Sequence, residues 1–165
     1  MEAVSFKAIT EAHLQEVLDI YNYYVIHTTV SFHTEPLQMK EMRENVIFDN
    51  SMYKAFIIEL AGAITGYILI NQHKKKQAYD VSGEVTIYLK PEYTGQGMGR
   101  KALRFIEQLA RERGFHVLIA TICGENEQSK HLFEKHGYSL CAHYKEIGYK
   151  FGRRLDVVAY QKIIS

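Results

Sequence analysis

The sequence predicts an α/β domain built on a mixed β-sheet. Segments whose apolar residues recur at helical spacing alternate with short segments rich in β-branched and aromatic residues. One of these, residues 115–122, is almost continuously apolar, as expected of a strand covered by helices on both faces. With 165 residues and 47% hydrophobic content, the chain is expected to form a single domain over residues 1–165.

The N-terminal part of the chain is predicted to contain one strand and two helices. The strand covers residues 4–9, and Thr10 is expected to cap a helix with a regular apolar stripe. A second helix is expected to start at residues 34–36, where a capping threonine is followed closely by Pro36. Residues 26–33 between them are expected to form a loop.

The middle of the chain is predicted to supply three strands. Residues 53–60 and 64–71 are rich in β-branched and aromatic side chains, and the short turn between them indicates a β-hairpin. Three adjacent lysines, residues 74–76, are expected in a solvated loop. Residues 84–89 form the third predicted strand.

The C-terminal half is predicted to alternate helices and strands. Helices are expected over residues 97–114 and 126–137, each ending at a glycine that can take a left-handed conformation. The apolar strand 115–122 lies between them. Two late strands, residues 138–144 and 157–163, are expected to flank a loop rich in Gly, Arg and Lys.

Charge and cysteine content limit the classes of partner and compartment. The 20 Lys and Arg residues against 19 Asp and Glu give a net charge of +1, so no overall field favours nucleic acid or an acidic membrane. Cys123 and Cys141 lie in apolar runs, which is typical of free thiols in a reducing compartment. The first residues lack the pattern of a signal peptide, and no long apolar run is present. The sequence therefore predicts a soluble, cytoplasmic protein without nucleic-acid or membrane partners.

The segment from Gly95 to Arg100 places three glycines between a strand and a helix. The first N–H groups of a helix have no internal partner and favour an anion, and glycines let the backbone approach a phosphate closely. The same glycines could form only a tight turn. A dinucleotide fingerprint would need glycine in place of Arg100, and a Walker A loop would need a Lys-Ser or Lys-Thr pair that is lacking. NAD and ATP are therefore not expected.

Two stretches around this loop resemble motifs of the GNAT acetyltransferases. Residues 84–89 followed by Thr94-Gly95-Gln96-Gly97-Met98-Gly99 are similar to motif A, and Asn126-Glu127-Gln128-Ser129 with residues 132–138 is similar to motif B. The resemblance implies a GNAT-like domain, with a sheet of about six or seven strands and about four helices, and acetyl-CoA as cosubstrate. It also implies that the cofactor is bound by Ile87, Tyr88, Leu89, Gly95, Gln96, Gly97, Met98, Gly99, Arg100 and Asn126.

A narrower resemblance covers almost the whole chain and points to the phosphinothricin N-acetyltransferase group. It implies transfer of acetyl to the amine of a small amino-acid-like substrate, of the phosphinothricin or methionine sulfoximine type, and a homodimer. The residues that carry it are Ile20-Tyr21-Asn22, Phe32-His33-Thr34-Glu35-Pro36, Tyr79 with Glu84, and Gly148-Tyr149-Lys150-Phe151-Gly152 through Asp156.

Acyl transfer to an amino acid requires a base, because the amine is mostly protonated near neutral pH. Glu84 is the candidate: it shares one strand face with Thr86 and Tyr88, and the catalytic glutamate of the GNAT family matches its position. The alternative is a surface glutamate paired with a nearby lysine. The resemblance also implies that a backbone N–H near Leu89 faces the developing oxyanion if the strand is bulged there.

The general acid remains unassigned. Many GNAT enzymes have a tyrosine in motif B where this chain has Phe133. A thiol pKa of about 8.5 makes a free thiolate a tolerable leaving group, so a dedicated acid is not essential. Tyr88, Tyr93 and Tyr144 are alternatives, and each could instead be a packing residue.

The candidate residues for binding the acceptor substrate come from three separate segments. Phe32 and Tyr79 could form apolar walls, and Lys74 could pair with an acceptor carboxylate. Each could equally serve in packing or solvation. Other candidates for the cation are Lys150, Arg153 and Arg154.

A metal is not expected, because His131 and His136 do not have the i, i+4 spacing of a zinc-binding helix. Two rival functions stay open at this point. One is a protein or peptide N-acetyltransferase with the same CoA-binding segments. The other is a non-catalytic acyl-CoA-binding module, which the presence of Phe133 makes conceivable.

Overall fold

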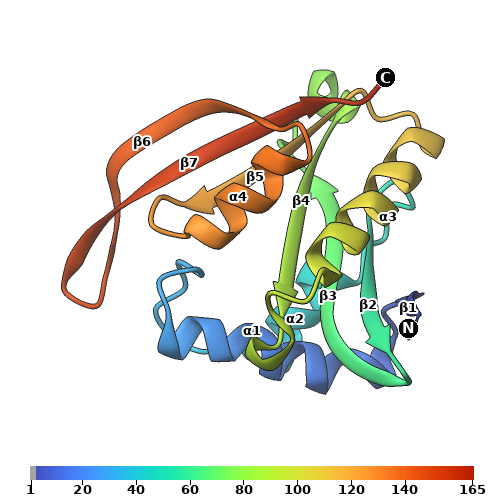
Figure 1. Cartoon of the computed structure of the whole chain (residues 1–165), viewed down its shortest axis with the longest axis horizontal. Coiled ribbons are helices and arrows are strands. Elements are labelled where there is room, and N and C mark those ends of the chain that lie inside the picture. The colour runs from blue at the N-terminus through green and yellow to red at the C-terminus, as the bar shows by residue number, and fades with distance from the viewer. Residues whose placement is uncertain (1–2) are drawn as a thin grey trace.

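A seven-stranded sheet runs through the chain in the order β1-β2-β3-β4-β5-β7-β6 (Figure 1). It is seen in a computed structural model that describes residues 3–165. Neighbouring strands are antiparallel except β4 and β5, which are parallel, so the predicted mixed sheet is confirmed. The strands are β1 (Val4–Ala8), β2 (Lys54–Leu60), β3 (Ala63–Gln72), β4 (Ser82–Leu89), β5 (Val117–Cys123), β6 (Ser139–Lys150) and β7 (Arg153–Ile163).

Helices cover both faces of this sheet. The α-helices of residues 3–165 are α1 (Leu14–His27), α2 (Met39–Val46), α3 (Met98–Glu112) and α4 (Glu127–Lys135). Three 3₁₀ turns join elements and are η1 (Glu11–His13), η2 (Gln77–Val81) and η3 (Pro91–Tyr93). In Figure 1, α3 crosses one face of β2–β4, while α1 and α2 lie on the other side.

Two apolar cores lie on opposite faces of the sheet, because side chains alternate along each strand. On β2, Phe56 and Ile58 join the core under α3, whereas Ile57 joins the core under α1 and α2. The same alternation continues onto β4, where Ile87 packs on the α3 side and Tyr88 on the α1 side. Ile87 and Tyr88 of β4 therefore face opposite sides of the sheet.

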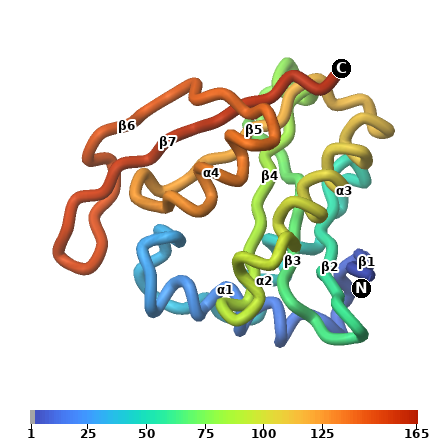
Figure 2. The backbone as a smooth tube through the Cα atoms, in the orientation of Figure 1, coloured from blue at the N-terminus to red at the C-terminus, as the bar shows by residue number. Residues whose placement is uncertain are grey.

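The sheet opens between β4 and β5. These strands pair only from Ser82 to Glu84, opposite Val117–Ile119, whereas β5 stays paired with β7 as far as Cys123. Beyond Glu84 the two parallel strands diverge, as the backbone trace also shows (Figure 2). β4 therefore presents a backbone edge that β5 does not pair.

The start of the second helix differs from the prediction. Residues 34–36 are not helical; α2 begins at Met39 after Gln38, whose backbone N–H donates to Glu41 Oε1 at 3.0 Å. A glutamate in the first turn thus satisfies the backbone N–H of the residue that precedes α2, and the helix starts there and not at Thr34. Thr10 precedes the short turn η1, and α1 then continues to His27, slightly beyond the predicted loop boundary at residue 26.

The last hairpin is also longer than predicted. Residues 145–156, expected to be a loop, continue β6 and β7 to a turn at Phe151 and Gly152, whose φ angles are +53° and +72°. A register shift between Tyr144 and Gly148 absorbs extra residues in β6 as a bulge. The loop-like composition was misleading because β6 is an edge strand, where charged residues and glycine are tolerated.

Candidate active site

The glycine loop has a left-handed backbone conformation at two of its three glycines. Gly95 and Gly97 have φ angles of +73° and +83°, a region that other L-residues rarely adopt. Gly97 is the N-cap of α3, and the helical ladder begins with Lys101 N–H donating to Gly97 O at 3.3 Å. The N–H groups of the three preceding helical residues have no intrahelical partner, so the start of α3 can bind an anion.

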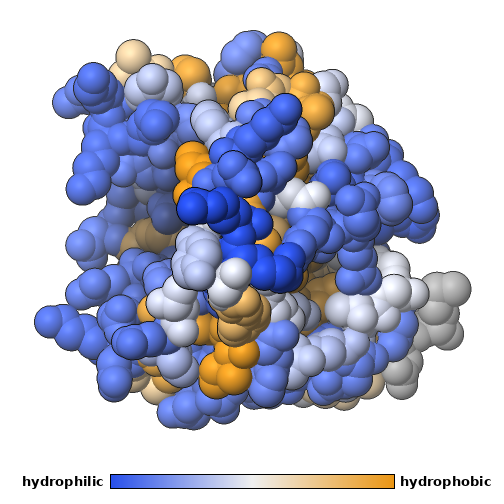
Figure 3. Space-filling view, turned by 90° about the vertical axis from the view of Figure 1, so that its left-hand side faces the viewer, coloured by the Kyte–Doolittle hydropathy of each residue, from blue (hydrophilic) through white to orange (hydrophobic). Residues whose placement is uncertain are grey.

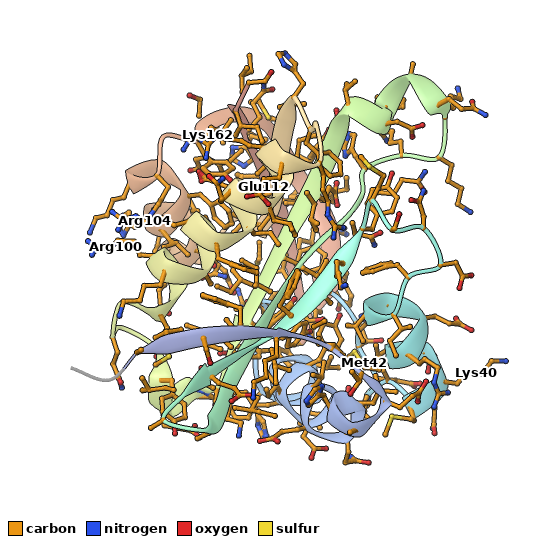
Figure 4. All side chains as sticks on the ribbon, turned by 90° about the vertical axis from the view of Figure 1, so that its right-hand side faces the viewer. Lys40, Met42, Arg100, Arg104, Glu112 and Lys162 are labelled. Atoms are coloured by element: carbon orange, nitrogen blue, oxygen red, sulfur yellow. The ribbon has the colours of Figure 1, made fainter. Side chains whose placement is uncertain are left out.

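Gly99 serves a different purpose, because it allows close packing of α3 against α4. A Cβ at Gly99 would lie 3.2 Å from Leu132 Cδ2. Met98 is buried in the core under α3, and Gln96 Nε2 donates to Glu92 O at 2.9 Å within the loop. Arg100, in contrast, is exposed and extends away from α3, as Arg104 does one turn later (Figure 4).

A cleft of about 460 Å³ lies beside this loop, between β4 and α4. It is lined by all the predicted cofactor residues except Gln96 and Met98, whose side chains are directed elsewhere. The full lining is Tyr24, Val30, Ile87, Tyr88, Leu89, Thr94, Gly95, Gly97, Gly99, Arg100, Asn126, Gln128, Ser129, His131, Leu132, Lys135 and His136. The structure therefore brings motif A and motif B onto opposite walls of one cleft.

The unpaired edge of β4 runs along this cleft. Lys90 N–H donates to Thr65 O at 2.8 Å, on the β3 side. Because backbone groups alternate along a strand, those of Tyr88 also face β3, whereas those of Ile87 and Leu89 face the opening toward β5. Tyr88 therefore contributes its side chain to the cleft and not its backbone N–H.

The bulge that the resemblance implied near Leu89 is not seen in the pairing of β4 with β3. The register is continuous from Leu89 opposite Gly66 to Gly83 opposite Gln72. The carbonyl of Leu89 accepts a hydrogen bond from the Tyr24 hydroxyl, which comes from α1. Burial raises the pKa of Tyr24 to about 12, so this tyrosine stays protonated and acts as a donor.

Asn126 links the cleft to the start of α4. As N-cap, its Oδ1 accepts from Ser129 N–H at 3.3 Å, and its side chain also lines a smaller cavity of about 90 Å³ between β4 and β5. Phe133 lines this cavity too and packs edge-on against Tyr138, with ring centroids 4.9 Å apart. Phe133, at the position where many GNAT enzymes have a tyrosine, therefore forms an apolar wall of this cavity.

Glu84 lies where β4 and β5 begin to diverge, and its side chain is 33% exposed. Its Oε1 is 2.8 Å from Nδ1 of His73, which follows the end of β3. The His73 ring also packs edge-on against Tyr79, with centroids 5.6 Å apart. Glu84 and Tyr79, both predicted from the sequence, are therefore joined through a histidine that the sequence analysis missed. The β3–β4 hairpin register, in which Asn71 pairs with Glu84, is the signal that could have found it.

The other residues predicted to bind the acceptor substrate lie on different segments. Phe32, in the α1–α2 loop, packs over Gly148 of β6, where a Cβ would come within 2.4 Å of the ring. Lys74 is exposed beyond the end of β3. The structure thus places Phe32 against the last hairpin, and Lys74 directly after His73.

Two of the alternative cations already have partners. Lys150 is buried, and its Nζ donates to Ser31 O at 2.7 Å. Arg153 makes two hydrogen bonds to Glu125, at 2.9 and 3.0 Å, and Thr29 donates a third hydrogen bond to this carboxylate. The hydrogen bonds from Arg153 and Thr29 lower the pKa of Glu125 to about 2. These hydrogen bonds connect the α1–α2 loop to the end of the last hairpin.

Among residues 3–165, His, Cys, Asp and Glu side chains do not gather in groups of three or more that could hold a metal ion. Within that range, helices are also too short or too polar to span a membrane.

Comparison with known proteins identifies the family. The model of the acetyltransferase (GNAT) family matches residues 17–138, so the chain belongs to this family. It is 31% identical to phosphinothricin N-acetyltransferase of Streptomyces coelicolor, over 92% of this chain and 91% of the relative. It is 29% identical to L-methionine sulfoximine/L-methionine sulfone acetyltransferase of Salmonella typhimurium, over 92% and 89%. The crystal structure of a phosphinothricin acetyltransferase from Sinorhizobium meliloti in complex with acetyl-CoA aligns with a TM-score of 0.92 and 26% identity, covering 98% of this chain and 89% of that one.

Proposed function

We propose that this protein is an acetyl-CoA-dependent N-acetyltransferase that acetylates the amine of a small amino-acid-like substrate, of the phosphinothricin or methionine sulfoximine type. The observation that carries the proposal is the position of Glu84. It lies where β4 and β5 separate, and further along β4 Ile87, Tyr88 and Leu89 line the cleft that also contains the anion-binding start of α3. The names of the relatives support this substrate type.

The cleft fits acetyl-CoA in three respects. The free N–H groups at the start of α3 suit the pyrophosphate, and Arg100 adds positive charge beside it. The open backbone N–H and C=O groups of Ile87 suit the amides of the pantetheine arm, which would pair with β4 as an added strand does. The Leu89 carbonyl is already bonded to the Tyr24 hydroxyl, so Leu89 offers only its N–H. Asn126 contributes from the opposite wall. Loop residues Gln96 and Met98 then act through backbone conformation alone.

The chemical step follows from this arrangement. Glu84 accepts a proton from the acceptor ammonium, directly or through water, and leaves a neutral amine. The amine nitrogen attacks the thioester carbon. The Leu89 N–H faces the opening toward β5 by strand alternation and without a bulge, and it is the proposed donor to the developing oxyanion. The C–N bond forms, the C–S bond breaks, and the CoA thiolate leaves. As the amide forms, the nitrogen passes its second proton through water to the thiolate, and Glu84 later releases the first proton to solvent.

The protonation of the thiolate needs no side chain of this protein. Phe133 cannot donate a proton, and burial raises the pKa of Tyr88, which makes it a poorer acid. A thiolate whose conjugate acid has a pKa of about 8.5 can depart unprotonated and be protonated by water.

The acceptor is proposed to bind on the face of β4 that carries Glu84. Phe32 and Tyr79 would flank its side chain, and Lys74 would pair with its carboxylate. This assignment is supported by the contact of Tyr79 with His73 and by the exposure of Lys74 next to it.

We also propose that residues 1–165 act as one domain in a cytoplasmic homodimer. On the side of the molecule where the last hairpin ends, hydrophobic side chains lie scattered among hydrophilic ones (Figure 3). The edge strand β6 supports the dimer, because large apolar side chains stand exposed along it. They are Leu140, Tyr144, Ile147 and Tyr149, followed by Phe151 in the turn. Sedimentation analysis tests this arrangement.

The decisive experiment measures thiol release from acetyl-CoA with phosphinothricin, methionine sulfoximine, common amino acids and peptides as acceptors. Turnover is expected with the small amino acids. A response to peptides alone would favour a protein acetyltransferase, and no turnover with intact acetyl-CoA binding would favour a non-catalytic binding module. The substitution Glu84→Gln is expected to lower kcat by about 10²- to 10⁴-fold while acetyl-CoA still binds. Unchanged turnover would remove Glu84 as the base.

A further inference from the structure

A histidine stands directly behind the proposed base. Glu84 Oε1 lies 2.8 Å from His73 Nδ1, and this is the one hydrogen bond of the Glu84 side chain to a side chain or backbone group of residues 3–165. An ionised carboxylate can only accept hydrogen bonds, so Nδ1 must carry the proton and donate it. The contact therefore fixes both the tautomer of His73 and the direction of the Glu84 carboxylate.

We infer that His73 is a positioning residue for Glu84. This inference rests on the function proposed above. By holding Oε1, the imidazole leaves Oε2 as the oxygen that faces the acceptor amine or its bridging water. A base must be held in hydrogen-bond reach of the proton it removes, and a displacement of about 1 Å can cost a hundredfold in rate.

Two further contacts keep the histidine itself in place. Its backbone follows the last residues of β3, where Asn71 and Gln72 are paired with Glu84 and Gly83. Its ring packs edge-on against Tyr79 of η2 at 5.6 Å and 72°. The imidazole is only 21% exposed, so it is held by the β3–β4 connection on one side and by an aromatic ring on the other. A histidine that merely capped a surface charge would need neither contact.

The position of His73 also separates the base from the lysines that follow it. Residues 74–76 are all lysine and exposed, and an ammonium group paired with Glu84 would hold its proton-accepting oxygens in an ion pair. The imidazole of His73 donates a single hydrogen bond, from Nδ1. It orients the carboxylate and leaves it able to accept a proton.

The test compares three variants with acetyl-CoA and methionine sulfoximine or phosphinothricin as the assayed acceptor. His73→Leu removes the donor and is expected to lower kcat about tenfold to a hundredfold, with the KM for acetyl-CoA unchanged. His73→Asn retains an N–H at the place of Nδ1 and is expected to restore kcat to within about threefold of the wild type. His143→Leu is the matched control, because His143 makes the same 2.8 Å contact with Asp156 in the last hairpin. Its kcat is expected to stay at the wild-type level.

A double-mutant cycle separates this inference from the proposed function. If His73 acts through Glu84, adding His73→Leu to Glu84→Gln should lower kcat by less than about twofold more. A full additional loss would overturn the inference, as would a His73→Leu enzyme with wild-type kcat. If Glu84→Gln itself has wild-type kcat, the proposed base is wrong instead.

A measurement that needs no acceptor completes the test. The ¹⁵N NMR signals of the histidine side chains report which ring nitrogen carries the proton, and His73 is assigned by the signal that disappears in His73→Asn. The Nδ1–H tautomer is expected near neutral pH. An Nε2–H tautomer would overturn the inference even if the protein were found to have no activity.

Discussion

Replacing Gly97 with alanine tests whether the backbone of the loop binds CoA. Gly97 has φ +83° and ψ 1°, and a Cβ at this position would meet no atom within 4 Å. The cost is therefore conformational only, about 1–2 kcal/mol for an L-residue in the left-handed region. If the loop relaxes to relieve this strain, its N–H groups turn away from the phosphate. The same 1–2 kcal/mol then appears as a Kd for acetyl-CoA that is about 5- to 30-fold higher.

The chain offers a closely matched control at Gly62, in the turn between β2 and β3. Gly62 has φ +81°, and a Cβ there would also meet no atom within 4 Å. With about 2.1 cal/mol/K of unfolding entropy per residue, Gly62→Ala should lower the Tm of the 165-residue chain by about 3–6 °C. Gly97→Ala should lower the Tm by less, because a loop that relaxes in the free protein carries the strain only when acetyl-CoA binds. Thermal unfolding measures this difference, and isothermal titration calorimetry with acetyl-CoA measures the Kd.

Only Gly97→Ala is expected to weaken acetyl-CoA binding. Equal, wild-type affinities in the two variants would show that the loop conformation does not serve the cofactor, and that the glycines make a turn and nothing more. A Tm loss in Gly97→Ala much larger than in Gly62→Ala would also refute the reasoning. It would mean that the added Cβ clashes with a neighbouring atom, although none lies within 4 Å of its position.

Two other predictions concern contacts that hold the cleft together. Because Arg153 and Thr29 lower the pKa of Glu125 to about 2, the stabilisation from this carboxylate is present above its ordinary pKa near 4.3 and is lost as pH falls toward 2. Glu125→Gln should therefore lower the Tm at pH 7. In a pH series, the difference in Tm from the wild type should shrink between pH 5 and about 2, and a constant difference would contradict this account. Tyr24→Phe removes the hydroxyl that donates to Leu89 O. It should lower the free energy of unfolding by about 1 kcal/mol, which corresponds to about 3 °C of Tm measured by calorimetry. An unchanged Tm would mean that water replaces the hydroxyl.

The parts of the site that were predictable from the sequence are those governed by local rules. A strand followed by alternating glycines and a helix is a local pattern, and the predicted helix start after the glycine loop is found, with Gly97 as the N-cap of α3. Strand alternation places the side chains of Glu84 and Tyr88 on the expected face. Burial of Phe133 between α4 and Tyr138 agrees with its apolar character, although the sequence does not show which cavity it lines.

The parts that were missed depend on contacts between distant segments. His73 follows the end of a strand and precedes three lysines, and its role emerges only when β3 and β4 pair in a definite register. The last hairpin was expected to be a loop because its glycines and charges are loop-like, yet pairing between β6 and β7 continues to Phe151. The start of α2 is set by Glu41 on the next turn, a weaker signal than the Thr34-Glu35-Pro36 segment that precedes it.

The separation of β4 from β5 also affects the stability of the whole molecule. Beyond Glu84, the inner edge of β4 has no strand partner, so water must solvate its open backbone groups when the cleft is empty. A pantetheine arm that pairs with this edge would act as the missing strand and tie the two halves of the sheet together. Ligand that binds only the folded state at 100 times its Kd adds about 2.7 kcal/mol to the free energy of unfolding. Cellular levels of acetyl-CoA would then influence how long the protein survives as well as how fast it works.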